Sequence, residues 1–242
     1  MLALGTLIAC GLILFGFVLE GGSPLALFNL PALMIVFGAT LGVGVAQSDR
    51  ARLINLRFVL QRLLSPSKPS FSETIDALTR WGQLARKDGV LALEKEASLQ
   101  PDAFLQEGML LLVDGVKGEG VQQHLTVAMV AEEEQYLEGA EFFEQLASYA
   151  PTMGILGAVL GLIQVMVEVS DTTNLGVGIA TAFVAILYGL ALANLLFLPV
   201  ASRLRWQAQR LYRHREMTLT GLMAIQQGEN PRHMAQRLRH FR

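Results

Sequence analysis

Few side chains in this sequence are arranged for chemistry. The 242 residues contain no phosphate-binding loop, no cluster with metal-ligand spacing and no nucleophile with partner residues at a recognised spacing. The four histidines are scattered: His124, His214, His233 and His240. The sequence therefore argues against an enzyme and predicts neither a cofactor nor a metal site.

Acidic and basic side chains are absent from four long stretches. Residues 1–19, 21–48, 145–167 and 172–202 contain no Asp, Glu, Lys, Arg or His. Proteins that conduct ions usually place such a group within a membrane span, despite its desolvation cost. The polar side chains of these stretches are predicted either to form helix–helix hydrogen bonds or to line a pathway whose ionisable group belongs to another chain: Thr6, Thr40, Thr152, Gln164, Thr181, Tyr188 and Asn194.

The same stretches are apolar and long enough to cross a bilayer. A helix of ~20 residues, at ~1.5 Å per residue, spans the ~30 Å hydrocarbon layer. We expect an all-α fold: a polytopic membrane protein with four transmembrane helices and a helical cytoplasmic domain. The expected division is 1–48 (transmembrane helices 1 and 2), 49–145 (cytoplasmic helical loop domain), 146–202 (transmembrane helices 3 and 4) and 203–242 (basic cytoplasmic tail).

Basic residues indicate the orientation of these spans. All 19 Lys and Arg lie in residues 50–117 or 203–242, and the short turns at 20–24 and 168–174 have none. Because Lys and Arg are retained on the cytoplasmic side, both termini and the large loop are predicted to be cytoplasmic. The tail should meet anionic lipid headgroups or acidic helices of the loop rather than nucleic acid. The acidic run Glu132–Glu144 is expected to be a solvated helix face.

Caps and breakers divide the large loop into helices. Ser70 and Glu73 match a capping box, Gly89 should end the helix that follows, and Pro101 fits a first helical position. The expected elements in order are an amphipathic helix at 49–64, a Ser-Pro breaker at 65–69, a helix after Ser70, a short helix at 90–98, a helix from Pro101 to Val116, a turn at 118–120 and a helix from Val121 into the third span.

Four motifs are distinctive: Val36–Gly42 (VFGATLG), Arg86–Glu94 (RKDGVLALE), Ala150–Gly161 with Leu187–Pro199, and Ile225–Arg232 (IQQGENPR). In this order, and covering the whole chain, they resemble the A subunit of the bacterial flagellar stator, the MotA/PomA family of the MotA/TolQ/ExbB proton channel superfamily. The hairpin alone is also similar to ExbB/TolQ-type energising subunits, but the four-span layout and the tail motif favour the stator.

The resemblance implies a subunit of the bacterial inner membrane that couples ion flow to torque in the flagellar motor. Five A subunits would surround two copies of a MotB/PomB-type B subunit, which supplies an ion-binding Asp and a peptidoglycan anchor. Cytoplasmic charges of the ring would engage the rotor protein FliG. Two alternatives stay open: an ExbB/TolQ-like energising subunit for a periplasm-spanning protein, and a passive membrane scaffold.

The resemblance, with the helical spacing of small residues, also assigns candidate residues. Those for rotor interaction are Arg86, Glu94, Lys87 and Glu96; those for conformational coupling are Pro151 and Pro199; those for the ion pathway or partner-helix face are Thr152, Gly154, Gly157, Ala158, Gly161, Thr181, Ala182, Ala185 and Gly189. Arg86 and Glu94 are expected on different helices near one tip.

The coupling ion is predicted to be the proton. Sodium-driven members of the resembled family carry Thr where this chain has Ala158, and a Thr-Thr pair where it has Ala185 and Ile186. Hydroxyl oxygens are ligands that a hard cation needs after losing its water. A proton requires only a carboxylate and a water path, so the loss of three hydroxyls favours the proton.

Overall fold

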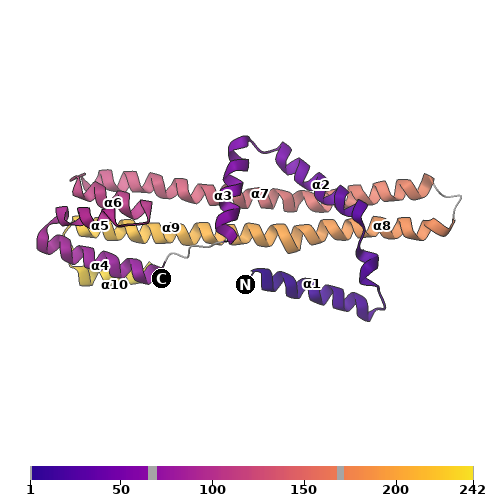
Figure 1. Cartoon of the computed structure of the whole chain (residues 1–242), viewed down its shortest axis with the longest axis horizontal. Coiled ribbons are helices and arrows are strands. Elements are labelled where there is room, and N and C mark those ends of the chain that lie inside the picture. Colours follow the sequence, from indigo (N-terminus) through magenta and orange to yellow (C-terminus); the bar gives the residue numbers. More distant parts are fainter. Residues whose placement is uncertain (1, 65–69, 168–171, 242) are drawn as a thin grey trace. The chain divides into compact units, whose positions relative to one another are not determined.

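Helices make up the architecture of the described chain. The computed structural model describes residues 2–64, 70–167 and 172–241, and no strand occurs among them (Figure 1). In chain order the elements are α1 (Leu2–Leu19), η1 (Pro24–Leu27), α2 (Leu30–Ala46), α3 (Arg50–Leu64), α4 (Phe71–Asp88), η2 (Val90–Ala92), α5 (Leu93–Ser98), α6 (Ala103–Val113), α7 (Gly118–Val167), α8 (Thr172–Ala191), the π-helical η3 (Leu192–Phe197), α9 (Leu198–Gln226), α10 (Pro231–Leu238) and η4 (Arg239–Phe241). The predicted all-α class is confirmed.

The chain divides into two compact units. The first unit contains residues 1–61 and 137–205, and the second contains residues 62–136 and 206–242. These cuts differ from the expected ones after residues 48, 145 and 202, because α3 and the part of α7 that follows residue 136 pack within the first unit. The expected four-part division stays a prediction about which segments lie in a membrane.

The first unit contains most of the apolar helical segments. Two helices of the described chain are long and apolar enough to cross a membrane, Gly118–Val167 and Gly178–Gln226, and both continue into the second unit. Three shorter helices are also apolar: Leu4–Leu19 and Leu30–Ala46 in the first unit, and Ala103–Val113 in the second. Large apolar side chains are exposed along α1, including Leu12, which is 66% exposed. A continuous apolar surface of this kind suits a hydrocarbon environment and not water.

Two helices pack against the hairpin of α7 and α8 within the first unit. Figure 1 shows α7 and α8 side by side. Helix α2 packs on α8, where Ala32 and Val36 form a buried cluster with Ala185. Helix α3 packs on α7, where the amide of Asn55 donates to the Glu138 carboxylate at 2.8 Å.

The second unit has a hydrophobic core of large apolar side chains. Helices α4, α5, α6 and α10, with the segments of α7 and α9 in this unit, bury a continuous apolar cluster. Its fully buried side chains include Leu78, Leu93, Met109, Leu125 and Leu222. Burial of apolar surface from water drives this packing, at roughly 25 cal/mol per Å².

Most helix boundaries in the second unit agree with the predicted ones. The Ser70 hydroxyl accepts a hydrogen bond from the Glu73 backbone N–H at 3.3 Å, which confirms the cap of α4. Gly89 ends that helix with a φ of 85°, a conformation that favours glycine. The breaker predicted at 65–69 lies outside the described residues.

Three predicted boundaries are wrong: both ends of α6 and the start of α7. Pro101 does not begin the next helix, because Asp102 caps it by accepting from the backbone N–H groups of Phe104 and Leu105, and α6 ends at Val113. The turn predicted at 118–120 is the first turn of α7. The glycines there suggested a turn, yet the helix tolerates them at its N-terminus.

Candidate functional site

Small residues form the contact between α7 and α8. A Cβ added to Gly154 would lie 3.0 Å from the Ala185 carbonyl oxygen, and one added to Gly189 would lie 2.5 Å from the Ala150 carbonyl oxygen. Backbones approach this closely only where side chains are minimal, and such packing joins helices in lipid. We call this contact the small-residue seam; its other members are Gly157, Gly161 and Ala182.

Most residues predicted for a partner-helix face therefore contact one another within this chain. Ala158, predicted for the same face, is 6% exposed. Thr152 is exposed, and its hydroxyl donates to the Tyr149 carbonyl at 2.7 Å. The exposed surface of the hairpin instead carries larger side chains, including Ile155, Leu156, Val159, Leu160, Ile163 and Phe183. A contact between the small residues and a partner helix stays a prediction.

Thr181, predicted for the ion pathway, belongs to a hydrogen-bonded group at the start of α2. Its hydroxyl accepts from the Asn29 amide at 3.0 Å, and the same Asn29 caps α2 by accepting from the Ala32 N–H. The Tyr188 hydroxyl donates to the Leu27 carbonyl at 2.5 Å and accepts from the Asn29 N–H at 2.9 Å. These bonds fix the N-terminus of α2 against α8. For Thr181 and Tyr188 the sequence had left two alternatives, helix–helix hydrogen bonds or the lining of a pathway, and the observed bonds are of the first kind.

The two predicted coupling prolines lie in different helical settings. Pro151 lies inside α7, where it leaves the Ala147 carbonyl without its usual donor. Pro199 is the second residue of α9, and the carbonyl that its ring crowds, that of Leu195, belongs to η3. The missing N–H and the crowded carbonyl explain why the helix widens to a π-helix there. Sequence reasoning identified both prolines but did not predict the π-helical segment.

The residues predicted for rotor contact lie where α4 ends and α5 begins. Arg86 and Lys87 occupy the last turn of α4 and are exposed, and Glu94 is exposed in the first turn of α5. Within the part of the chain that the structure describes, none of these three side chains forms an ion pair. The prediction that Arg86 and Glu94 lie on different helices agrees with these bounds. We call Arg86, Lys87 and Glu94 the charged tip.

Glu96, the fourth residue predicted there, differs from the other three. Its carboxylate accepts a hydrogen bond from the Trp81 indole at 3.1 Å, and Trp81 is buried in the core. This bond links α5 to α4 and holds the two helices that carry the charged tip. The contact supports a positioning role for Glu96 rather than direct recognition.

The tail motif supports the same helix from the other side. Gly228, with a φ of 68°, ends the turn after α9, and Asn230 caps α10 by accepting from the Arg232 N–H at 3.0 Å. Helix α10 then packs on α4, where a Cβ on Gly82 would lie 3.4 Å from Pro231. Gly82 is one helical turn before Arg86, so the motif braces α4 close to the charged tip.

A buried ion cluster in the second unit has no counterpart in the predicted site. The Arg215 side chain is 9% exposed, and its guanidinium donates to Asp102 at 2.7 and 2.8 Å and to Glu132 at 2.8 and 3.2 Å. It also lies 4.7 Å from the centre of the Phe104 ring. Arg215, on α9, is thereby joined both to the N-cap residue of α6 and to α7.

Electrostatics keep this cluster charged. Burial alone would lower the pKa of Arg215, but its hydrogen bonds to Glu132 and the negative charges of Asp102 and Glu132 outweigh burial and raise that pKa. The neighbouring His214 is 3% exposed, and burial followed by the Arg215 charge lowers its pKa to about 4. Its Nε2 lies 2.9 Å from the Thr74 hydroxyl. His214 is therefore neutral at physiological pH.

The acidic run Glu132–Glu144 is not simply a solvated face, because several of its carboxylates have protein partners. Glu132 bonds to Arg215, and Glu138 accepts from Asn55. Glu144 forms a paired contact with Arg205, whose hydrogen bond lowers the pKa of that carboxyl. These internal contacts leave the charged tip as the better candidate for an external partner.

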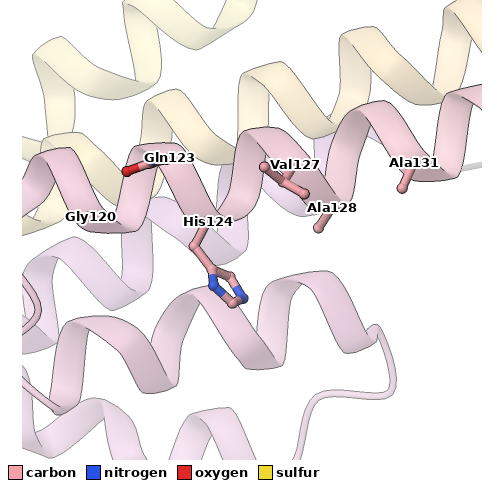
Figure 2. Close-up of a pocket in the computed structure, with 6 residues that line it drawn as sticks. All are labelled: Gly120, Gln123, His124, Val127, Ala128 and Ala131. Carbon is pink, nitrogen blue, oxygen red and sulfur yellow. The ribbon is translucent and has the colours of Figure 1, made fainter.

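A shallow pocket of about 460 Å³ lies along α7 in the second unit. Figure 2 shows its lining, with the His124 ring pointing away from the axis of α7. The Nε2 of His124 lies 2.7 Å from the Glu107 carboxylate. All lining residues come from α7: Gly120, Gln123, His124, Val127, Ala128 and Ala131. One helix face without converging polar groups does not define a small-molecule site, and no group of three possible metal ligands occurs in the described residues.

Two family models match this sequence. Residues 96–217 match the MotA/TolQ/ExbB proton channel family, and residues 3–89 match the motility protein A N-terminal family. Motility protein A of Bacillus subtilis is 33% identical over 236 residues, which cover 97% of this chain and 87% of that protein. Motility protein A of Helicobacter pylori is 30% identical over 240 residues, which cover 98% and 93%.

Solved structures show the same likeness over the whole fold. A chain of the C. jejuni MotAB structure matches with a TM-score of 0.95 and 29% identity, and the match covers 100% of this chain and 94% of that one. A chain of the Bacillus subtilis flagellar MotAB stator complex matches with a TM-score of 0.88 and 32% identity, covering 97% and 92%. The chain therefore belongs to the MotA/TolQ/ExbB proton channel family and, within it, to the flagellar stator subunits of the motility protein A type in the inner membrane.

Proposed function

We propose that this chain is the A subunit of a proton-driven flagellar stator. It assembles with a MotB/PomB-type B subunit, forms a ring of A subunits, five by analogy with the family, and turns its charged tip against the rotor protein FliG. The observation that carries the proposal is the match along nearly the full length of the chain to stator subunits, together with the match to the motility protein A N-terminal family. Four spans, with both termini and the second unit in the cytoplasm, complete the proposal.

The proposed conduction depends on a second chain. The four uncharged stretches contain no side-chain carboxylate, amine, guanidinium or imidazole that could carry a proton within the membrane. A partner carboxylate against the hairpin would be desolvated, which raises its pKa and keeps it neutral until polar groups or water reach it. The membrane potential then supplies ~2.3 kcal/mol per charge per 100 mV, several times the thermal energy.

The contacts within this chain support a second way for the partner helix to meet the hairpin. Because the small-residue seam is occupied within this chain, the partner would meet the flank that carries Thr152 and the larger apolar side chains. The seam would keep α7 and α8 together as that flank follows the partner, and Pro151 and Pro199 would absorb the bending. Replacement of Gly161 or Ala185 by Leu would then stop the motor by forcing the hairpin apart.

Proton flux in vesicles tests the proposal. The chain reconstituted alone should not dissipate a proton gradient, whereas the chain with its B subunit, after removal of the plug segment of that subunit, should do so. Motility should follow the proton gradient at constant sodium. Proton leakage through the chain alone at the rate of the unplugged complex would show that the carrier group lies in this sequence. Motility that requires external sodium would contradict the choice of ion.

A further inference from the structure

Helix α3 has one face with no role in the function described so far. Its inner face packs Leu53 and Leu56 against an apolar cluster of the first unit. Its outer face exposes Arg50, Ile54 and Arg57, at positions one and two helical turns apart. Ile54 is 73% exposed, which is unusual for a large apolar side chain on a charged helix.

The position of α3 in the chain and in the unit places this face at a membrane surface. Helix α3 begins at Arg50, shortly after α2 ends at Ala46. It meets α7 at Glu138 and Gln145, where the uncharged stretch of α7 begins. Figure 1 shows α3 running across α7 and not along it. If α7 spans the membrane as proposed, α3 lies in the plane of the cytoplasmic surface, so this inference rests on the proposed topology.

The charges of α3 differ between its two faces. Arg52, on the inner side, bonds to Gln145 and lies 4.0 Å from Glu141. Arg50 and Arg57, on the outer side, form no ion pair with any described residue. Guanidinium groups bind phosphate oxygens well. Helices with an apolar residue between such groups lie in the headgroup layer of anionic bilayers.

We propose that the outer face of α3 binds anionic phospholipids of the cytoplasmic leaflet. Arg50 and Arg57 hold the phosphates of the headgroups, and Ile54 enters the layer between the headgroups and the acyl chains. Helix α3 follows the apolar helix α2 closely in the chain, which favours the bilayer over a soluble partner. Each arginine contributes about a fivefold preference for anionic lipid.

Site-directed fluorescence in vesicles can locate this face. In a Cys10→Ala background of the chain with its B subunit, single cysteines at Ile54, Leu12 and Leu91 receive an environment-sensitive dye. Leu12, on the apolar α1, controls for membrane insertion, and Leu91, 71% exposed beside the charged tip, controls for water. The Ile54 dye should be quenched by lipids spin-labelled near the headgroup, the Leu12 dye by lipids labelled deep in the chain, and the Leu91 dye only by aqueous iodide.

Headgroup preference then tests the arginines. Spin-labelled phosphatidylglycerol should quench the Ile54 dye more than spin-labelled phosphatidylcholine, and the double variant Arg50→Gln with Arg57→Gln should lower that preference by at least tenfold. Arg213→Gln, an exposed arginine of α9 in the second unit, is the matched control and should leave it unchanged.

Different failures have different meanings. Iodide quenching of the Ile54 dye, with normal lipid quenching at Leu12, would overturn the inference and leave the topology intact. Shielding of Ile54 from both quenchers would mean that a neighbouring copy covers the face. Equal quenching by both headgroups would exclude the arginines as a lipid site. An absence of lipid quenching at Leu12 would overturn the proposed topology itself.

Discussion

The two units hold their helices together with different contacts. In the first unit, α7 and α8 meet at the small-residue seam, and Asn29, Thr181 and Tyr188 add hydrogen bonds. In the second unit, large apolar side chains fill a core, and Arg215 joins three elements through two carboxylates. Apolar side chains gain little by leaving lipid for another helix, so close backbone approach matters there. In water the hydrophobic effect assembles the core, which can then enclose a compensated ion cluster.

The largest effect is expected from breaking the ion cluster of the second unit. Arg215→Met would leave Asp102 and Glu132 without their main counter-charge and should lower the free energy of unfolding by about 3 kcal/mol. Thermal unfolding of the purified complex, followed by tryptophan fluorescence, measures the loss.

A compensating variant sharpens this test. Asn at position 102 can still cap α6, so Arg215→Met combined with Asp102→Asn and Glu132→Gln should recover much of the lost stability. If the triple variant is no more stable than the single one, the cost arises from packing against Phe104 and not from the charges.

The seam of the first unit should be sensitive to a single methyl group. Gly189→Ala would place a Cβ 2.5 Å from the Ala150 carbonyl oxygen, and relief of this clash should cost about 1–3 kcal/mol. Gly176→Ala in the same helix meets nothing within 4 Å and is the matched control; it should be neutral or slightly stabilising. Thermal stability in detergent compares the two, and equal melting temperatures would show that α7 and α8 are not this close.

Acid should weaken the second unit through His214. The folded pKa of His214 is about 4, below the ordinary value of 6.5. The unfolded chain therefore binds this proton first, so the stability that neutral His214 provides is complete above pH 6.5 and is lost as pH falls towards 4. At pH 5.5 the loss should be roughly 1 kcal/mol.

A variant that cannot titrate isolates this effect. His214→Gln should remove the part of the pH dependence that lies between pH 6.5 and 4, measured as the difference in melting temperature between pH 7 and 5.5. A variant with the same pH dependence as the original chain would assign the effect to other groups.

The local parts of this structure could be predicted from sequence, and the contacts between distant helices could not. The cap at Ser70 and the end at Gly89 depend only on nearby residues. The start of α6 was misplaced because Pro101 and Asp102 both favour the start of a helix. In the structure the Asp102 carboxylate is the N-cap, so the helix begins after it. The sequence did contain a signal for the π-helical segment, because Pro199 has no backbone N–H to donate to the Leu195 carbonyl.

The buried ion cluster shows the limit most clearly. Arg215 was predicted only as one of several basic residues in a tail that meets lipid headgroups or acidic helices of the loop; its contact with Glu132 agrees with the second alternative, but its burial was not predicted. It nevertheless falls on a helical stripe with buried Ala208, Leu219 and Leu222, which is the pattern of a core position. Its two partners come from positions 113 and 83 residues away, and no local pattern could have supplied them.

The smallest effect on stability, and a large one on function, is expected at the charged tip. Arg86 and Glu94 are exposed and have no ion pair among the described residues, so Arg86→Glu and Glu94→Lys should leave the melting temperature and membrane expression unchanged. Motility should still fall, because exposed charges steer transient contacts that must form and release at each step.

Reversal of the complementary charges on the rotor protein should restore part of the swimming speed, which a mere folding defect would not allow. Glu96→Gln is the informative neighbour, since it keeps an acceptor for the Trp81 indole and should swim almost normally. If both single reversals swim like the original chain, the charged tip is not the main contact. The buried Arg215 cluster and the exposed charged tip would then differ only in burial, and the exposed charges would have no separate role in function.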